Sequence, residues 1–379
     1  MDVVTLVPPP YVAGPLRLRP FAALRLIPRR VGDPTTGRAF ARPYRDVAAR
    51  LSRWQARGLL ERDTEPALYL HEYSSNGITI RGLVGALDVS RRATLPEDRA
   101  VLPHEGIHPG QADDLAARMA EMRLNPAPIL LVHNGTDRLR ELLATVVAVA
   151  ADHQFTDRSH QEHRIWTITS ADLLAKIAEE LAPTKALIAD GHHRYAAYLR
   201  LQRREPGGPC DAGLAMLVDQ RATPLFLGPI HRTLSGTTFD DVRDAADLLG
   251  LPVHLVSEHE AVLGLAADAL PITDGEQWAL IKLELTAQRT AVEVLHQDLL
   301  PALPHGPSAI DYHHTVDEAL QAAKQPSTVG ILLPAPPVDT VIEVAAANRL
   351  LPEKATSFQP KPSLGVLIRD LHDAPADPS

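Results

Sequence analysis

The sequence has 379 residues and an ordinary globular composition, 45% hydrophobic and 22% charged. Its 38 basic and 47 acidic residues give a net charge of −9, which argues against a general nucleic-acid binder, because such a protein needs a basic face. The N-terminus does not resemble a signal peptide, the longest apolar run (142–151) is about half of a bilayer span, and Cys210 is the single cysteine. We therefore expect a cytoplasmic protein with no membrane partner, no nucleic-acid partner and no internal disulfide.

Up to residue 168 the chain alternates between predicted strands and predicted helices. A short strand is expected at 21–27, and apolar residues at helical spacing predict a helix at 44–60. Two β-prone runs flank Asn76-Gly77, a dipeptide typical of tight hairpins. The two runs and the elements that follow them are expected as strands at 67–73 and 78–87, a helix at 112–124, a strand at 129–133, a helix at 137–151 and a strand at 164–168.

The clearest unit of the sequence lies around residue 190. Ser170 is expected to cap a helix whose buried face includes Ile177 and Leu181. The continuous apolar run 185–189 then predicts a strand that is covered on both faces. It ends at Asp190-Gly191, where another helix is expected to begin. This order of helix, strand, glycine turn and helix is α/β construction.

The second half of the chain continues in the same style. The expected elements are strands at 213–218 and 225–227, a helix at 240–249, a strand pair near 278–285 and 291–295, a helix at 315–323, a strand at 330–333 and a helix at 338–348. The fold class that we predict is mixed α/β, with mixed sheets flanked by helices in a composite chain of two parts. These parts are 1–205 and 206–371, packed on one another, and a disordered tail is expected at 372–379.

The segment from Asp190 to Arg194 has the features of a phosphate-binding turn. A glycine before a helix lets the backbone approach a phosphate, and the helix N-terminus offers N–H groups and the positive end of its dipole. We expect Gly191, His192, His193 and Arg194 to hold phosphate oxygens, because guanidinium and imidazole groups donate hydrogen bonds to them. Asp190 would bind Mg²⁺ or polarise a hydroxyl. The alternative is an ordinary turn in which the histidines only satisfy backbone groups.

A second histidine motif does not predict a metal site. His104-Glu105-Gly106-Ile107-His108 matches the zinc-protease pattern, in which two histidines four residues apart bind one metal from a continuous helix. Here Pro103, Gly106 and Pro109 oppose a helix, and the residue before a proline is pushed away from the α region. We expect a loop that follows a strand, from which the Glu105 carboxylate could still serve as a base.

Several blocks of the sequence together are specific for one family. They are Pro20 to Arg25, Pro103-His104-Glu105, Ala189 to Tyr198 (ADGHHRYAAY), Gly228 to Arg232, and Leu351 to Lys361. On these blocks, nearly the whole chain resembles the bacterial "domain of unknown function 1015" family. The turn itself is similar to that of the ParB/sulfiredoxin superfamily, which implies a core of that type with nucleotide phosphates on the turn.

The chain departs from the family pattern at two places. The family usually has a lysine and an Asp-Arg pair soon after its His-Glu, whereas this chain has Gln111-Ala112-Asp113-Asp114. The family's Pro-Pro-Tyr usually follows the Pro-Phe-x-x-Leu-Arg block, whereas here Pro9-Pro10-Tyr11 precedes it. These differences put the specificity and the activity of this member in doubt.

The resemblance and the turn together favour a small-molecule kinase that uses ATP or ADP with Mg²⁺ and acts on a hydroxyl metabolite such as free serine. Phosphoryl transfer needs clamped phosphates, a placed metal and a carboxylate near the attacking hydroxyl. Glu105 is the expected base, and Asp190 would support the metal or the hydroxyl. The residues expected around this site are His104, His231, Arg232, Lys354 and Lys361. For Arg232 and the two lysines, a surface salt bridge is the simpler interpretation.

Two alternatives stay open. One is a nucleotide-binding switch or partner-binding protein without turnover of a small acceptor. The sequence shows no recognisable helix-turn-helix and has an acidic charge balance, and both observations argue against a DNA-loading protein. The other is a sulfiredoxin-like repair enzyme, which ranks last because that role needs a cysteine in the turn, where this chain has histidine. Association of the chain with itself as a homo-oligomer is also left open.

Overall fold

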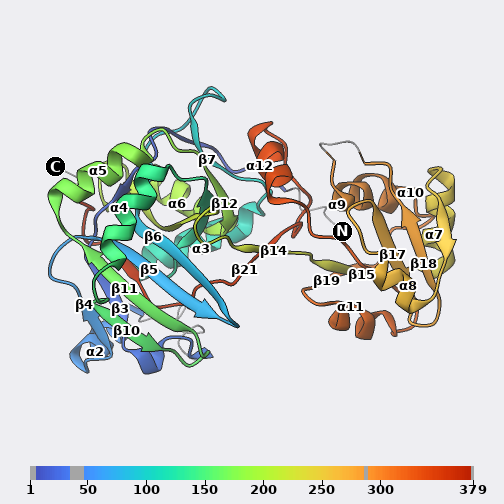
Figure 1. Ribbon diagram of the computed structural model, residues 1–379, viewed down its shortest axis with the longest axis horizontal. Helices are drawn as coiled ribbons and strands as arrows, with labels where there is room; N and C mark the ends of the chain where they lie inside the picture. Colours follow the sequence, from blue (N-terminus) through green and yellow to red (C-terminus); the bar gives the residue numbers. More distant parts are fainter. Residues whose placement is uncertain (1–5, 35–46, 286–288, 377–379) are drawn as a thin grey trace. The chain divides into compact units, whose positions relative to one another are not determined.

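The computed structural model describes residues 6–34, 47–285 and 289–376. The chain forms two compact units, one made of Met1–Leu225 with Pro360–Ser379 (unit 1) and one made of Phe226–Gln359 (unit 2) (Figure 1). Both units combine sheets with helices, which confirms the mixed α/β class. The domain boundary expected after residue 205 stays a prediction, because compactness does not show which segments fold alone. No helix in the described ranges combines the length and the apolar character that a membrane span requires.

The main element of unit 1 is a ten-stranded mixed sheet with the order β1-β7-β12-β9-β13-β6-β5-β11-β10, in which β2 also pairs with β6. The pairs β7–β12 and β9–β13 are parallel and the other pairs are antiparallel. The strands are β1 (Val12–Ala13), β2 (Leu18–Arg19), β5 (Leu68–Ser75), β6 (Ile78–Asp88), β7 (Arg99–Leu102), β9 (Ile129–His133), β10 (His153–Thr156), β11 (Glu162–Ile168), β12 (Ala186–Asp190) and β13 (Ala212–Asp219).

The sequence patterns explain the central strands of this sheet. β12 is an uninterrupted apolar run, and its first four residues are buried, as a strand covered on both faces requires. Asn76 and Gly77 both have positive φ, 51° and 78°, so β5 and β6 are joined by the tight hairpin turn that this dipeptide favours. The predictions of a strand at 129–133, a hairpin around residue 76 and a strand before Asp190 are confirmed.

Helices pack on the large sheet and share one apolar core with it. The core cluster includes residues of α3, α4, α5 and α6, and α4 and α5 lie side by side (Figure 1). The helices of unit 1 are η1 (Pro28–Arg30), α2 (Val47–Ala56), α3 (Pro109–Met122), α4 (Asp137–Val147), α5 (Ala171–Leu181), α6 (His192–Arg204) and η2 (Pro209–Asp211). The expected helix at 44–60 corresponds to α2, and its expected first residues lie outside the described ranges.

A small four-stranded sheet, β4-β3-β22-β8, completes unit 1. It joins β3 (Ala23–Leu26), β4 (Leu60–Arg62) and β8 (Leu124–Asn125) to β22 (Ile368–Asp370), so a strand near the C-terminus pairs with strands of the N-terminal part. Of the tail expected to be disordered, residues up to 376 are described, and the Ala376 N–H donates to the Pro20 carbonyl at 3.0 Å. Residues 377–379 lie outside the described ranges.

Unit 2 contains a six-stranded sheet, β16-β18-β17-β20-β15-β19, and the pair β14-β21. Its strands are β14 (Phe226–Gly228), β15 (His231–Ser235), β16 (Val253–Leu255), β17 (Ala269–Thr273), β18 (Trp278–Lys282), β19 (Ala309–His313), β20 (Thr328–Ile331) and β21 (Ser357–Gln359). Its helices are α7 (Phe239–Leu248), α8 (Glu258–Leu263), α9 (Ala291–Val294), η3 (Leu295–Leu299), α10 (Leu300–Ala302), α11 (Val316–Ala323) and α12 (Val338–Ala346).

Two local expectations are wrong. The segment 291–295, expected to pair as a strand with β18, forms the helix α9, because Thr290 and Glu293 make a capping box that satisfies its first N–H groups. The partners of β18 are instead β16 and β17. Ser170 occupies the N-cap position of α5, but its side chain accepts no capping hydrogen bond there.

The geometry at 104–108 supports the rejection of a zinc-protease helix. His108 has extended backbone angles, φ −79° and ψ 115°, and α3 begins only at Pro109. Ile107 pairs with Val7 as an isolated β-bridge. The two histidines therefore lie on a loop after β7, as expected from the prolines and Gly106.

Candidate functional site

The turn between β12 and α6 has the backbone geometry expected from its glycine. Gly191 is the N-cap of α6 with φ 96° and ψ 32°, in the left-handed region that favours glycine. A Cβ at this position would lie 3.1 Å from Ile129 Cγ2 and 3.1 Å from Arg194 Nε, so the neighbouring side chains also select glycine. The first turn of a helix leaves its N–H groups without intrahelical acceptors. α6 has 13 residues, so this end carries the positive pole of a full helix dipole.

Asp190, the last residue of β12, is held between two cations. Arg194 Nη2 donates to Asp190 Oδ2, and Lys361 Nζ donates to Asp190 Oδ1 at 2.5 Å. Arg194 Nη1 also donates to the Pro128 carbonyl, so its guanidinium is anchored at two points. Burial raises the pKa of Asp190, but Arg194 and Lys361 outweigh that effect and hold the pKa below its ordinary value. The carboxylate is therefore charged at neutral pH.

The imidazoles of His192 and His193 connect the turn to the loop after β7. The His104 N–H donates to His192 Nε2 at 3.3 Å, and the His108 N–H donates to His193 Nε2 at 3.0 Å. The His104 and His192 rings meet edge to face, with centroids 4.6 Å apart. Burial and the neighbouring His193 lower the pKa of His192 to about 3, so its ring is neutral and can accept. These contacts account for one nitrogen of each imidazole.

The same contacts bring Glu105 to the turn. β7 runs parallel to β12, so the loop that follows it emerges at the edge of the sheet where Asp190 ends. Glu105 lies between the two loop residues that contact α6, and its side chain is 16% exposed, with Oε1 3.8 Å from His104 Nε2. Burial and the adjacent His192 lower the pKa of His104 well below its ordinary value. A partly exposed carboxylate beside a neutral imidazole can accept a proton from a bound hydroxyl.

Of the eleven residues predicted for the site, eight lie in unit 1 and three lie in unit 2. The residues at the turn and on the segments that touch it are His104, Glu105, Asp190, Gly191, His192, His193, Arg194 and Lys361. Those in unit 2 are His231, Arg232 and Lys354.

In unit 2, the surface salt bridge offered for Arg232 is wrong. The residue is buried, and its Nη2 donates to the carbonyls of Glu353 and Lys354 at 3.0 and 2.9 Å. His231 is also buried, and its Nδ1 accepts from the Leu333 N–H at 3.1 Å. Lys354 Nζ lies 4.3 Å from the centre of the Tyr312 ring, in a cation–π contact. The side chains of His231 and Arg232 therefore hold backbone segments of unit 2 together, whereas Lys354 contacts an aromatic ring.

Sequence reasoning missed the residues that hold the Lys361 segment. Gln161 Nε2 donates to the Lys361 carbonyl at 2.8 Å, and the Ser363 N–H donates to Gln161 Oε1 at 3.1 Å. The Tyr73 hydroxyl donates to the Pro360 carbonyl at 2.6 Å. All three contacts join residues about 200 or more positions apart, so local patterns give no signal for them. They fix the backbone from which Lys361 reaches Asp190.

Asp190 is the residue predicted to bind Mg²⁺. Within the described ranges, no group of three or more His, Cys, Asp or Glu side chains lies together as a metal site. Each oxygen of Asp190 already receives a cationic donor. Magnesium keeps several waters and is commonly held by one or two carboxylates together with substrate phosphates. Asp190 could therefore hold Mg²⁺ only as part of a nucleotide complex in which the Lys361 ion pair opens.

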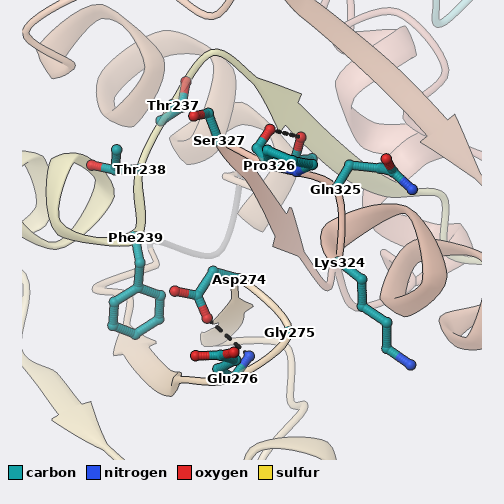
Figure 2. A pocket seen from close by; sticks show the side chains of 11 residues that line it. Thr237, Thr238, Phe239, Asp274, Gly275, Glu276, Lys324, Gln325, Pro326 and Ser327 are labelled. Carbon is teal, nitrogen blue, oxygen red and sulfur yellow. Dashed lines mark hydrogen bonds between the residues drawn. The ribbon is translucent and has the colours of Figure 1, made fainter.

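Unit 2 carries a cavity of about 530 Å³ that none of the sequence-predicted site residues lines. It lies at the start of α7, between the 274–276 turn and the segment 324–328 (Figure 2). Two acidic residues line it, Asp274 and Glu276. The Asp274 carboxylate accepts hydrogen bonds from the backbone N–H groups of Glu276 and Gln277 at 3.0 and 2.8 Å, so it closes its own turn.

The fold and the turn together define a mixed α/β protein with a candidate anion-binding turn at a sheet edge. The chain belongs to the family described as "Protein of unknown function (DUF1015)", whose family model matches residues 16–266. This confirms the family expected from the sequence. None of the curated proteins matches the chain.

Solved structures give more distant likenesses. A mutant free serine kinase in complex with ADP is 16% identical, with 71% of this chain and 89% of that chain covered and a TM-score of 0.39. A conserved hypothetical protein from Pyrococcus furiosus is 16% identical, with coverages of 72% and 93% and a TM-score of 0.39. SbnI with C-terminal truncation, from Staphylococcus aureus, is 11% identical, with coverages of 76% and 87% and a TM-score of 0.43. Likenesses at this level carry no argument about the function of this chain.

Proposed function

We propose that this protein is a nucleotide-dependent phosphotransferase that uses ATP or ADP with Mg²⁺ and acts on a small hydroxyl metabolite, with free serine as the first acceptor to test. The observation that carries the proposal is the assembly around Gly191. A glycine turn at a helix N-terminus, two cationic side chains and two carboxylates meet at one edge of the sheet. These are the parts that phosphoryl transfer requires, because its catalysis rests on positioning and charge.

In this proposal the N–H groups at the start of α6 bind phosphate oxygens, and Lys361 supplies a mobile positive charge. Lys361 is suited to that role because its side chain is 45% exposed and pairs with the turn through the Asp190 carboxylate. Arg194 is 23% exposed and anchored at Asp190 and Pro128. If Arg194 also binds phosphate, its guanidinium must divide its N–H donors between the nucleotide and these two protein partners. Its contribution to the turn is to hold Asp190 in place.

Glu105 is the proposed general base. Its loop is held to the start of α6 by the backbone hydrogen bonds from His104 and His108 to His192 and His193, which keeps the backbone of Glu105 near the phosphate turn. Accepting the proton of the acceptor hydroxyl would generate the attacking oxygen beside the bound phosphates. Asp190 would help to orient the Mg²⁺ that arrives with the nucleotide.

The second candidate is a nucleotide-binding switch without turnover of an acceptor. The observation that favours it is that Asp190 and Arg194 already satisfy one another, which makes the turn a stable element before any ligand binds. A sulfiredoxin-like repair enzyme is the weakest reading. Cys210, the single cysteine, is buried on η2, and burial raises the pKa of its thiol.

The experiment is to incubate the protein with ATP or ADP, Mg²⁺ and free serine, threonine or homoserine, and to follow phosphorylated product by ³¹P NMR. Glu105→Gln should keep nucleotide binding and lose turnover by at least about a hundredfold, the low end of the effect of a general base. Glu121→Gln, a change at an exposed glutamate of α3, is the matched control. Nucleotide binding without acceptor-dependent product would favour the switch. Absence of nucleotide binding would exclude both.

A further inference from the structure

The segment that carries Lys361 lies directly after a boundary between the two compact units. Unit 2 ends at Gln359, the last residue of β21, and unit 1 resumes at Pro360. We call residues 360–363 the strap. Lys361 is its second residue, and the Lys361 Nζ atom donates to Asp190 Oδ1 at the end of β12. The position of that ammonium therefore depends on the contacts that fix the strap in unit 1.

Gln161 pairs with the main chain of the strap through both ends of its carboxamide. Its Nε2 donates to the Lys361 carbonyl at 2.8 Å, and its Oε1 accepts from the Ser363 N–H at 3.1 Å. The Ser363 hydroxyl also donates to Oε1 at 3.1 Å. A carboxamide offers the same donor and acceptor as a peptide group, so Gln161 pairs with residues 361–363 as a neighbouring strand would. These bonds involve the main chain of Lys361 and leave its side chain to Asp190.

Gln161 is itself held in place by a buried acceptor. It is 9% exposed and lies in the turn between β10 and β11. Its N–H donates to Asp157 Oδ1 at 2.9 Å, and its carbonyl accepts from the Asp157 N–H at 2.9 Å. Burial raises the pKa of Asp157, but hydrogen bonds, first among them those from Ser363 and His163, outweigh that effect and hold the pKa below its ordinary value. A charged carboxylate therefore fixes the turn that presents Gln161.

Tyr73 gives the strap a second anchor. Its hydroxyl donates to the Pro360 carbonyl at 2.6 Å, and its ring is fully buried. Tyr73 lies on β5 directly opposite His163 of β11, so both anchors come from neighbouring strands. The Lys361 side chain, by contrast, is 45% exposed. The main chain of the strap is therefore fixed, while the ammonium at the end of the lysine side chain stays accessible.

We propose that Gln161 is a positioning residue for the phosphate-binding ammonium of Lys361. The inference rests on the proposed function, since a nucleotide phosphate is the group that would take the ammonium from Asp190. A segment that is ordered before its ligand arrives loses less conformational freedom on binding, and this raises the affinity. Gln161 touches no substrate in this proposal and acts through Lys361 alone. Its effect on nucleotide affinity must therefore vanish when the lysine ammonium is absent.

A double-mutant cycle tests this dependence. ADP with Mg²⁺ is titrated by isothermal titration calorimetry into the full chain of wild type, Gln161→Met, Lys361→Met and the double variant. We expect Lys361→Met to weaken binding at least about tenfold and Gln161→Met to weaken it about threefold to tenfold. The double variant should bind no more weakly than Lys361→Met. If Gln161→Met weakens binding by the same factor in both backgrounds, Gln161 acts elsewhere and the proposal is overturned.

Gln202→Met is the matched control. This half-buried glutamine of α6 also loses two side-chain hydrogen bonds, one with Arg92 at 2.9 Å and one with Asp211 at 3.0 Å. It should leave the affinity for ADP unchanged, and a loss as large as that of Gln161→Met would overturn the proposal by showing a general effect on the structure. Urea unfolding identifies any variant that does not fold. Tyr73→Phe removes only the hydroxyl of the second anchor, should weaken binding in the same way, and replaces Gln161→Met in the cycle if that variant does not fold.

The result for wild type separates this inference from the proposed function. Wild-type protein that does not bind ADP overturns both. Wild-type protein that binds ADP no more tightly than the folded variant of Gln161, or of Tyr73 in its place, overturns this inference alone.

Discussion

At the scale of single residues, Asp190 organises the candidate phosphate turn. Its two oxygens are shared between Arg194, four residues later on α6, and Lys361, which is distant in sequence. The local partner is visible in the sequence, because the end of β12, the glycine turn and the first residues of α6 follow one another within five positions. The distant partner is not, because it depends on how Tyr73 and Gln161 hold the 360–363 segment. The motif therefore identifies the turn and Arg194, but it does not identify Lys361, the second cation that pairs with Asp190.

Arg194→Ala is expected to weaken the binding of ADP to the full chain. Loss of one charged hydrogen bond costs about 1.5–3 kcal/mol, which is roughly tenfold to 150-fold in the dissociation constant. Isothermal titration calorimetry measures the change. Arg200→Ala is the control, because this arginine also lies on α6 but pairs with the exposed Asp113. Equal affinity of Arg194→Ala and wild type would count against the site by showing that Arg194 neither binds the phosphates nor supports the turn that does.

Gly191→Ala is expected to destabilise the protein by about 1–3 kcal/mol, because the residue has φ 96° and a Cβ there would crowd Arg194 and Ile129. Gly208→Ala is the control. Gly208 has an extended backbone, and a Cβ added there would meet no atom within 4 Å. Urea unfolding measures both changes in free energy. A smaller effect at Gly191 than at Gly208 would show that the backbone of the turn is not constrained as described.

At the scale of elements, capping decides where helices begin more reliably than residue type alone. Ser170 and Thr136 both occupy N-cap positions, but only the Thr136 hydroxyl accepts a hydrogen bond, from the Leu139 N–H at 3.0 Å. In unit 2, the capping box of Thr290 and Glu293 starts a helix in a segment whose apolar composition suggests a strand. Composition describes burial, whereas the cap determines which backbone groups are satisfied.

Thr136 and Ser170, two hydroxyl residues at N-cap positions of unit 1, give a matched pair of substitutions. Thr136→Ala should lower the free energy of unfolding by about 0.5–2 kcal/mol, because the Leu139 N–H loses its acceptor. Ser170→Ala should cost less, because no capping bond is lost. Urea unfolding followed by far-UV circular dichroism measures both. A larger loss for Ser170→Ala would contradict the capping pattern of the structure.

At the scale of the whole molecule, buried neutral histidines link stability to pH. Burial lowers the pKa values of His133, His231 and His296 to about 4 and that of His192 to about 3. As the pH falls below about 6.5, the unfolded chain binds protons at these positions and the folded chain does not. The protein is therefore most stable above pH 6.5 and loses stability toward pH 4, where the folded histidines begin to titrate.

The expected loss is about 1.4 kcal/mol per pH unit for each such imidazole in this window. Urea unfolding at pH 7.5, 6.0 and 5.0 measures it. The variant His133→Phe has one such imidazole fewer, so its stability should depend less steeply on pH than that of wild type. A free energy of unfolding that stays constant from pH 7.5 to 5.0 would show that these side chains are not buried in their neutral form.

The sequence by itself determined the family, the mixed α/β class, the β5–β6 hairpin and the strand-glycine-helix unit at residue 190, because each rests on local periodicity, turn chemistry or contiguous motifs. The tertiary structure alone decided that β7 lies beside β12, which brings Glu105 to the turn, and that Lys361 reaches Asp190. It also decided that His133 and Asp219, which are far apart in the sequence, line the same cavity of unit 1. The physical reason is that strand order and side-chain meeting points depend on packing between segments far apart in the chain, for which local patterns carry no signal.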